Sequence, residues 1–105
     1  MTNEEIEKRA NSFFNQLNLS ETTTRNYRSA LNSIFLKDML YKEWGLTTVF
    51  AITDLESLWQ IYSKINLHPQ NVSKHRIYSA AIMKYIRFLN QGLRYGKRID
   101  FGKSR

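Results

Sequence analysis

The sequence contains no cysteine, one proline and only four glycines among its 105 residues. Without cysteine the chain cannot form a disulfide framework, use a thiolate nucleophile or build a zinc site of the cysteine type. The scarcity of proline and glycine excludes collagen-like and low-complexity chains, and no run is long and apolar enough to predict a membrane span. Because 42% of the residues are hydrophobic, we expect one compact domain with a single core.

Acidic residues are scarce in the C-terminal part of the chain. Six Lys or Arg stand against eight Asp or Glu in residues 1–63, whereas ten stand against one in residues 64–105. This asymmetry favours an anionic partner, nucleic acid or a membrane surface, over a basic protein without such a partner. The N-terminal MTNEEIEKRA lacks the basic start and apolar run of a secretory signal, so we expect a cytoplasmic protein.

Apolar residues recur at helical spacing in four segments of the chain. The first helix is expected over residues 4–17, where early glutamates suit a helix N-terminus. A second helix is expected to begin after an N-cap at Ser20 and to reach about Tyr41. Residues 49–52 form a buried connector, and Thr53 with Glu56 matches a capping box for a third helix that ends near Ile65.

The fourth helix is expected after a loop around Pro69, with Ser73 as its N-cap and Gly92 as its C-cap. Four helices joined by short connections predict the all-α class, a compact four-helix bundle over residues 1–92. Residues 93–105 carry five basic residues and one acid, and they are expected to form a basic flexible tail or the start of a linker.

Side chains suited to catalysis or metal binding do not cluster in the sequence. His68 and His75 are seven residues apart, with no carboxylate or further histidine at ligand spacing. Helix capping and the helix dipole explain the glutamates near the N-terminus and the acids around residue 54, and no glycine-rich phosphate loop is present. We therefore expect no catalytic residue, metal, cofactor or small-molecule substrate, and no enzyme activity from this chain by itself.

Two expected helix starts carry cations. The second helix opens with LSETTTRNYRSAL, which places hydroxyls, guanidinium groups and free backbone N–H donors where phosphate oxygens can bind. Helix capping by the threonines and solvation of the arginines explains this stretch equally well. Cations are also expected in the first turn of the fourth helix, where they oppose the helix dipole. Further along that helix, Lys84 and Arg87 fall away from the apolar stripe and give a cationic edge.

The segments TTTRNYRSALNSI and KHRIYSAAIMKYIRFLNQG together resemble the core-binding, SAM-like domain of tyrosine recombinases and phage integrases. Thr23, Tyr27 and Leu31 reproduce the Thr-x-x-x-Tyr-x-x-x-Leu helix of that family, and a small-residue helix ending in Phe-Leu follows. The resemblance covers about residues 6–92 and implies a non-catalytic bundle that lays its second and fourth helices against double-stranded DNA. The residues that it places at the major groove and backbone are Thr22, Thr24, Arg25, Arg28, Lys74, His75, Arg76, Ser79 and Lys84.

A recombinase also needs a catalytic domain with arginines, a histidine and a nucleophilic tyrosine, for which 105 residues leave no room. The chain is therefore expected to be either the N-terminal domain of a longer parent chain or a reuse of the same bundle. The ending of residues 78–89 also resembles modules that precede nucleases in bacterial restriction-type proteins. A third interpretation is a helical protein-interaction module whose basic face meets an acidic protein and has no affinity for DNA.

Overall fold

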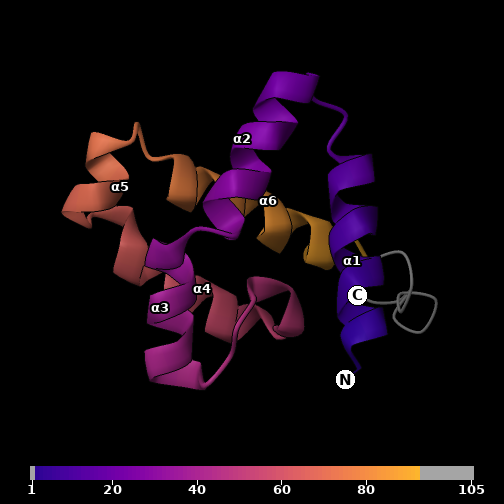
Figure 1. Cartoon of the computed structure of the whole chain (residues 1–105), viewed down its shortest axis with the longest axis horizontal. Coiled ribbons are helices and arrows are strands. Elements are labelled where there is room, and N and C mark those ends of the chain that lie inside the picture. Colours follow the sequence, from indigo (N-terminus) through magenta and orange to yellow (C-terminus); the bar gives the residue numbers. More distant parts are fainter. Residues whose placement is uncertain (1, 93–105) are drawn as a thin grey trace, which may run out of the picture.

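The computed structural model describes residues 2–92, which form six α-helices and one 3₁₀ helix (Figure 1). The α-helices are α1 (Asn3–Gln16), α2 (Glu21–Leu31), α3 (Ile34–Trp44), α4 (Leu55–Asn66), α5 (Pro69–Ser73) and α6 (Ile77–Gly92), and the 3₁₀ helix η1 is Val49–Ala51. No strand occurs within residues 2–92, so the expected all-α class is confirmed. The expected basic tail lies outside the described residues.

The long helix predicted from Ser20 to Tyr41 is instead two helices, α2 and α3. Ser20 caps α2 as predicted, but the helix breaks at Asn32 and Ser33, where Ser33 has an extended backbone. The Ser33 hydroxyl donates to the Ala30 carbonyl at 2.7 Å and accepts from the Leu36 N–H at 3.3 Å. This side chain therefore ends one helix and caps the next. The bundle has five longer helices and the short α5 rather than four helices.

The N-cap of α4 also differs from the predicted one. Asp54, not Thr53, caps the helix, and its carboxylate accepts the backbone N–H of Ser57 at 2.9 Å. The predicted capping box between Thr53 and Glu56 is therefore wrong, since the helix begins one residue later. This hydrogen bond to Ser57 holds the pKa of the Asp54 carboxyl below its ordinary value.

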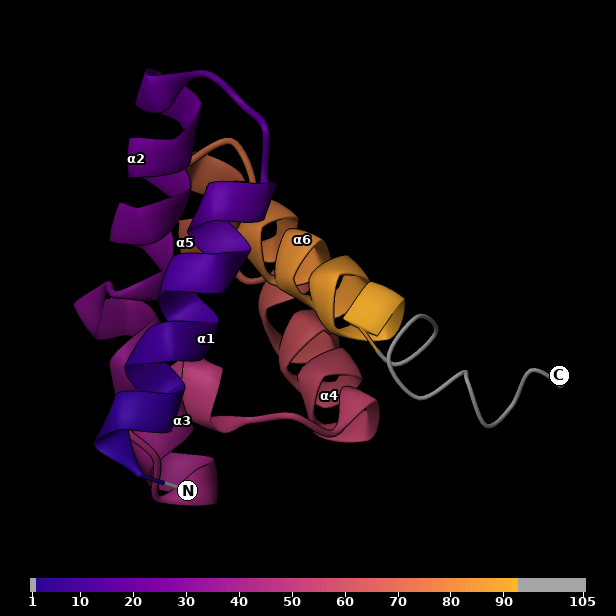
Figure 2. The ribbon, with the colours of Figure 1, turned by 90° about the vertical axis from the view of Figure 1, so that its right-hand side faces the viewer.

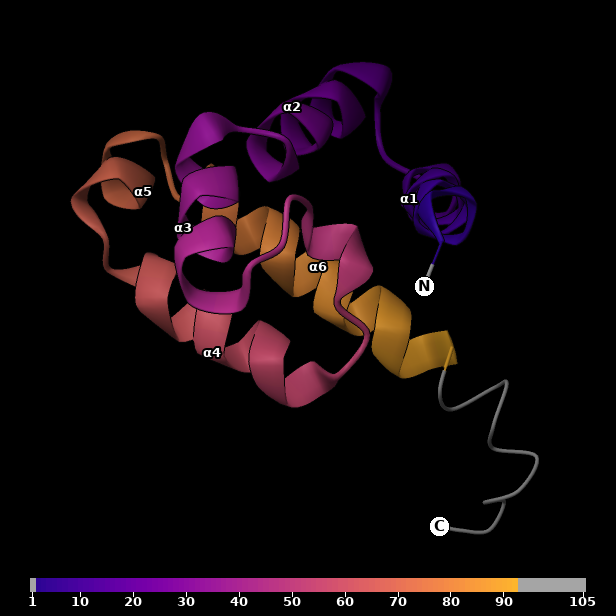
Figure 3. The ribbon, with the colours of Figure 1, turned by 60° about the horizontal axis from the view of Figure 1, so that its bottom comes forward.

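Helix α6 lies at the centre of the molecule and packs mainly against α4 and α2. Figures 2 and 3 show α2 and α4 on opposite sides of α6. The salt bridge between Glu43 and Lys64 places the end of α3 beside α4. Tyr85 of α6 is fully buried, with its ring 5.4 Å from that of Phe13 and 5.0 Å from that of Phe50. Its hydroxyl donates to the Ile52 carbonyl at 3.0 Å, and burial raises the pKa of this phenol well above its usual range. These contacts tie α1, η1 and α6 into one core.

Candidate nucleic-acid interface

Lys74, His75 and Arg76 do not lie in the first turn of α6, as the sequence predicted, but in the turn between α5 and α6. Ser73 ends α5 and donates its hydroxyl to the Gln70 carbonyl, so it does not cap α6. His75 and Arg76 have φ angles of 57° and 61°. Consecutive left-handed residues other than glycine are uncommon and cost conformational energy. The surrounding structure must therefore hold this turn in place.

A buried asparagine holds the turn. Asn71 is fully buried, and its side-chain oxygen accepts the backbone N–H of Ser79 at 3.1 Å. Its amide nitrogen donates to the Ser79 hydroxyl and to the Asn66 carbonyl, both at 3.0 Å. The backbone N–H of Arg76 donates to the Asn71 carbonyl at 2.7 Å. Asn71 thus supplies the cap predicted for Ser73 and joins the end of α4 to the start of α6.

This network changes the role of two of the predicted DNA contacts. Ser79 is only 4% exposed, and its hydroxyl donates to the Arg76 carbonyl at 3.2 Å while accepting from Asn71. The Ser79 side chain is therefore enclosed and stabilises the turn, and a DNA contact by Ser79 stays an untested prediction. The Arg76 guanidinium donates to the Asn66 carbonyl at 2.9 Å, so at least one of its donors is engaged at the C-terminus of α4. Cations at a helix C-terminus are favourable there.

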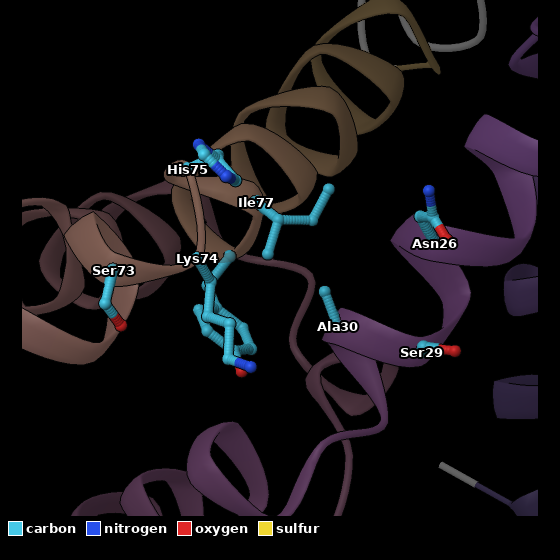
Figure 4. A pocket seen from close by; sticks show the side chains of 8 residues that line it. Asn26, Ser29, Ala30, Ser73, Lys74, His75 and Ile77 are labelled. Carbon is cyan, nitrogen blue, oxygen red and sulfur yellow. The ribbon is translucent and has the colours of Figure 1, made fainter.

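Lys74 and His75 remain exposed at the rim of a groove between this turn and α2 (Figure 4). The groove has a volume of about 750 Å³. Figure 4 shows Ala30 of α2 and Ile77 of α6 pointing toward each other across the gap. The polar rim on the α2 side comes from Asn26 and Ser29. The α2 segment and the turn, which the sequence analysis identified as separate binding candidates, therefore line the same groove. No carboxylate is among its lining residues.

The predicted contacts of α2 lie on different faces of the helix. Arg28 lies toward α1, with its guanidinium carbon 4.2 Å from the centre of the Phe14 ring. At about 100° per residue, the groove-lining Asn26 and Ser29 point to another side of the helix. Thr22 and Arg25 are exposed, and Thr24 is half-buried. Arg28 therefore lies away from the groove, whereas Arg25 is on the same face as Ser29, one turn earlier, but is not among the residues that line the groove.

Lys84 and Arg87 lie further along α6, where they line a smaller depression of about 260 Å³ against the end of α1. Lys84 is half-buried and Arg87 is exposed. Helical rise separates Lys84 from the start of α6 at Ile77 by about 10 Å. Ala80, Lys84, Arg87 and Gln91 follow one stripe along the helix. The cationic edge predicted for this helix is present in the structure.

Charge pairing differs between the two sides of the described bundle. On the α3 and α4 side, Lys42 pairs with Asp38 at 3.1 Å and Lys64 with Glu43 at 2.9 Å. The sequence has no Asp or Glu from Ser57 to Gly92. Within residues 2–92, no salt bridge involves the cations of α2, the turn or α6. Those cations are Arg25, Arg28, Lys74, Arg76, Lys84 and Arg87.

The described residues also limit other kinds of site. Residues 2–92 contain no group of three or more potential metal ligands. Among the helices of this range, none is long and apolar enough to cross a membrane. Comparison of the chain with protein-family models, curated proteins and solved structures finds no match. The resemblance to integrase core-binding domains therefore rests on the residues of this chain alone.

Sequence reasoning missed three residues of this interface. Asn26 and Ser29 line the groove, and their spacing of three residues on a helix is the signal that could have identified them. Asn71 organises the turn, but its sequence context is a polar loop beside Pro69, which gives no sign of burial. The positions of these three residues depend on packing between elements distant in the sequence.

Proposed function

We propose that this bundle is a non-catalytic DNA-binding domain of the integrase core-binding type, which contacts duplex DNA through α2, the turn and α6. The observation that carries the proposal is the charge distribution. The cations of α2, the turn and α6 form no salt bridge within residues 2–92. By contrast, Lys42 of α3 and Lys64 of α4 are each neutralised by a neighbouring acid. A surface on which cations outnumber acids and form no salt bridges attracts a polyanion, and phosphate contacts supply most non-specific affinity for DNA.

The stripe on α6 is suited to approach a duplex. Lys84 and Arg87 extend from it, while Ala80 adds little bulk between them and the turn. Lysine and arginine contacts to phosphates fix the position and orientation of a protein on DNA, and contacts to base edges specify sequence. We propose that α6 lies in the major groove and that the turn and α2 contact the DNA backbone.

Such a domain binds DNA and does not catalyse a reaction on it. In an integrase-like parent chain it would form one half of a clamp around DNA beside a catalytic domain. In a restriction-type nuclease it would serve as an accessory module with the same binding surface. Both versions predict DNA binding by this chain without cleavage or strand exchange.

The proposal is tested by titrating the chain against a labelled duplex and a labelled single strand of mixed sequence at low and at physiological salt. We expect micromolar affinity for the duplex, falling steeply as salt rises because bound phosphates release counterions. Absence of duplex binding even at low salt overturns the proposal. Equal affinity for the single strand contradicts the duplex geometry.

One observation favours a protein partner as the second candidate. Phe35 and His68 are in contact, with ring centres 4.8 Å apart. Their chain neighbours Ile34 and Leu67 are 85% and 75% exposed, and Val72 of α5 is 47% exposed. Exposed apolar residues that lie together are typical of protein interaction sites. A protein-interaction module predicts no duplex binding in the same titration and loss of partner binding on replacing Ile34 and Leu67 by serine.

A further inference from the structure

The groove between α2 and the turn has the chemistry of a phosphodiester site. Its rims offer hydrogen-bond donors of different kinds: the Lys74 ammonium, the His75 imidazole, the Asn26 amide and the Ser29 hydroxyl. Within residues 2–92 none of these four side chains makes a hydrogen bond with another side chain or a salt bridge. An anion with several acceptor oxygens is the ligand that such rims complement.

The floor of the groove argues against a stacked base. Ala30, Ile77 and Tyr78 form it, and Tyr78 is only 7% exposed. Its ring packs against that of Phe35 with centres 4.8 Å apart, so it does not present a free face. Recognition of single strands depends on exposed aromatic faces on which bases stack. A floor of Ala30 and Ile77, with Tyr78 almost covered, instead suits the apolar face of a deoxyribose.

The rim is fixed before any ligand arrives. The left-handed His75 and Arg76 are held by the Asn71 network and by the bond from Arg76 to Asn66. Conformational energy stored in a turn persists only where the surroundings enforce it, and such turns occur at ligand sites. A preformed rim loses little conformational freedom on binding.

We propose that this groove holds the sugar–phosphate backbone of one strand of duplex DNA. Lys74 and His75 donate to phosphate oxygens from one rim, and Asn26 and Ser29 donate from the other. The inference rests on the proposed DNA-binding function and adds the path of one strand to it. Because phosphates are the same in every sequence, the contact contributes affinity without sequence preference.

The absence of cysteine allows a direct test, since a single introduced thiol reacts alone. Ser29→Cys places it on the groove rim, and Gln60→Cys places it at an exposed position of α4 that does not line the groove. Duplex affinity is measured for each variant before and after reaction with N-cyclohexylmaleimide, a bulky uncharged reagent. Circular dichroism melting verifies the fold of each variant before and after modification. If Ser29→Cys does not fold, Asn26→Cys on the same rim takes its place.

We expect modification at Ser29→Cys to weaken binding about tenfold or more for unrelated duplexes, as loss of one or more charge-assisted contacts requires. Modification at Gln60→Cys should change affinity less than about twofold. If the wild-type chain binds duplex and the modified Ser29→Cys variant binds equally well, the groove assignment is wrong while the DNA-binding function stands. An effect confined to one sequence indicates base contact and overturns the backbone assignment. No wild-type binding overturns both proposals.

Discussion

The two sides of the bundle differ in whether their cations form salt bridges. On the α3 and α4 side, two of the three lysines pair with acids, Lys42 with Asp38 and Lys64 with Glu43, while Lys37 forms no salt bridge within residues 2–92. On the α2 and α6 side, cations have no acidic partner among residues 2–92. Exposed ion pairs contribute only about 0 to 1 kcal/mol, so neither arrangement explains the stability of the fold, which the shared apolar core supplies. Unpaired like charges repel one another, so the cationic side does not stabilise the fold.

The largest effect is expected where the two sides are joined, at Asn71. Replacing it with leucine removes its amide from the Asn66 carbonyl and from both polar groups of Ser79. The loss of three hydrogen bonds, which leaves the buried Ser79 N–H without its side-chain acceptor, should lower the free energy of unfolding by about 2 to 4 kcal/mol. Denaturant unfolding measures this loss, with Asn90→Leu on the exposed surface of α6 as the control. Equal stability of Asn71→Leu and the wild type would show that the network adds no net stability.

The charge comparison is tested most directly with two double variants that remove the same net charge. Lys84→Ala/Arg87→Ala removes cations from the α6 stripe, and Lys42→Ala/Lys64→Ala removes paired cations from the other side. We expect the first to weaken duplex binding about tenfold or more and to lower the salt slope by about two, one for each lost phosphate contact.

The second double variant should leave the salt slope unchanged, because its cations are neutralised by neighbouring acids and lie away from the proposed interface. Affinity titrations over a range of salt concentrations measure both quantities. If the two variants lose the same affinity, binding follows net charge alone, and the distinction between the two sides has no consequence for DNA.

A smaller effect separates two arginines that the sequence treats as equivalent. Arg28 lies over the Phe14 ring, whereas Arg25 is exposed and no salt bridge holds it within residues 2–92. Arg28→Ala should cost about 0.5 to 1 kcal/mol of stability through the lost cation–π contact. Arg25→Ala should leave stability within about 0.5 kcal/mol and lower the salt slope of DNA binding by about one. Thermal melts and salt titrations of both variants check this division, which the reverse pattern would contradict.

Helical periodicity predicted most of the fold because each amphipathic helix carries its own pattern. It placed the first helix, the start of α2 and the apolar stripe of α6. It also placed α4, but Trp59, which was expected to face inward, is 44% exposed, and Ile61 is fully buried instead. It missed the break at Asn32 and Ser33, since apolar Ile34 and Phe35 continue the helical spacing. The break depends on local hydrogen bonds of polar side chains, which compete with the helix and leave Ile34 at 85% exposure.

The candidate site was less accessible from the sequence. The distribution of charge in the sequence predicted binding residues at the start of α2, in the turn and in α6. The structure places Lys74 and His75 at the groove that α2 also lines. The assignments that changed, those of Ser73, Ser79 and Arg76, depend on Asn71 and Asn66. A contact between Asn66 and Arg76 spans ten residues and two helix ends, so no local pattern reveals it.

The smallest predicted effect concerns Asp54, an acid on the α3 and α4 side. Asp54 caps α4, and its hydrogen bond from Ser57 lowers the carboxyl pKa in the folded state relative to the unfolded chain. Stability from this charge is therefore fully present above the unfolded pKa, about 3.9, and is lost as pH falls through the folded pKa. Asp54→Asn keeps the cap without the titration, because asparagine caps helices about as well as aspartate.

The stability difference between wild type and Asp54→Asn should therefore be constant from about pH 7 to pH 5 and should shift against the wild type below about pH 4. Denaturant unfolding across this range measures it, and Glu5, whose pKa is lowered by Thr2, cancels because both proteins contain it. Duplex affinity at neutral pH should be the same for both proteins, since Asp54 belongs to the side away from the proposed interface. A pH-independent stability difference would mean that the carboxylate charge adds nothing to the cap, and altered affinity would extend the interface to α4.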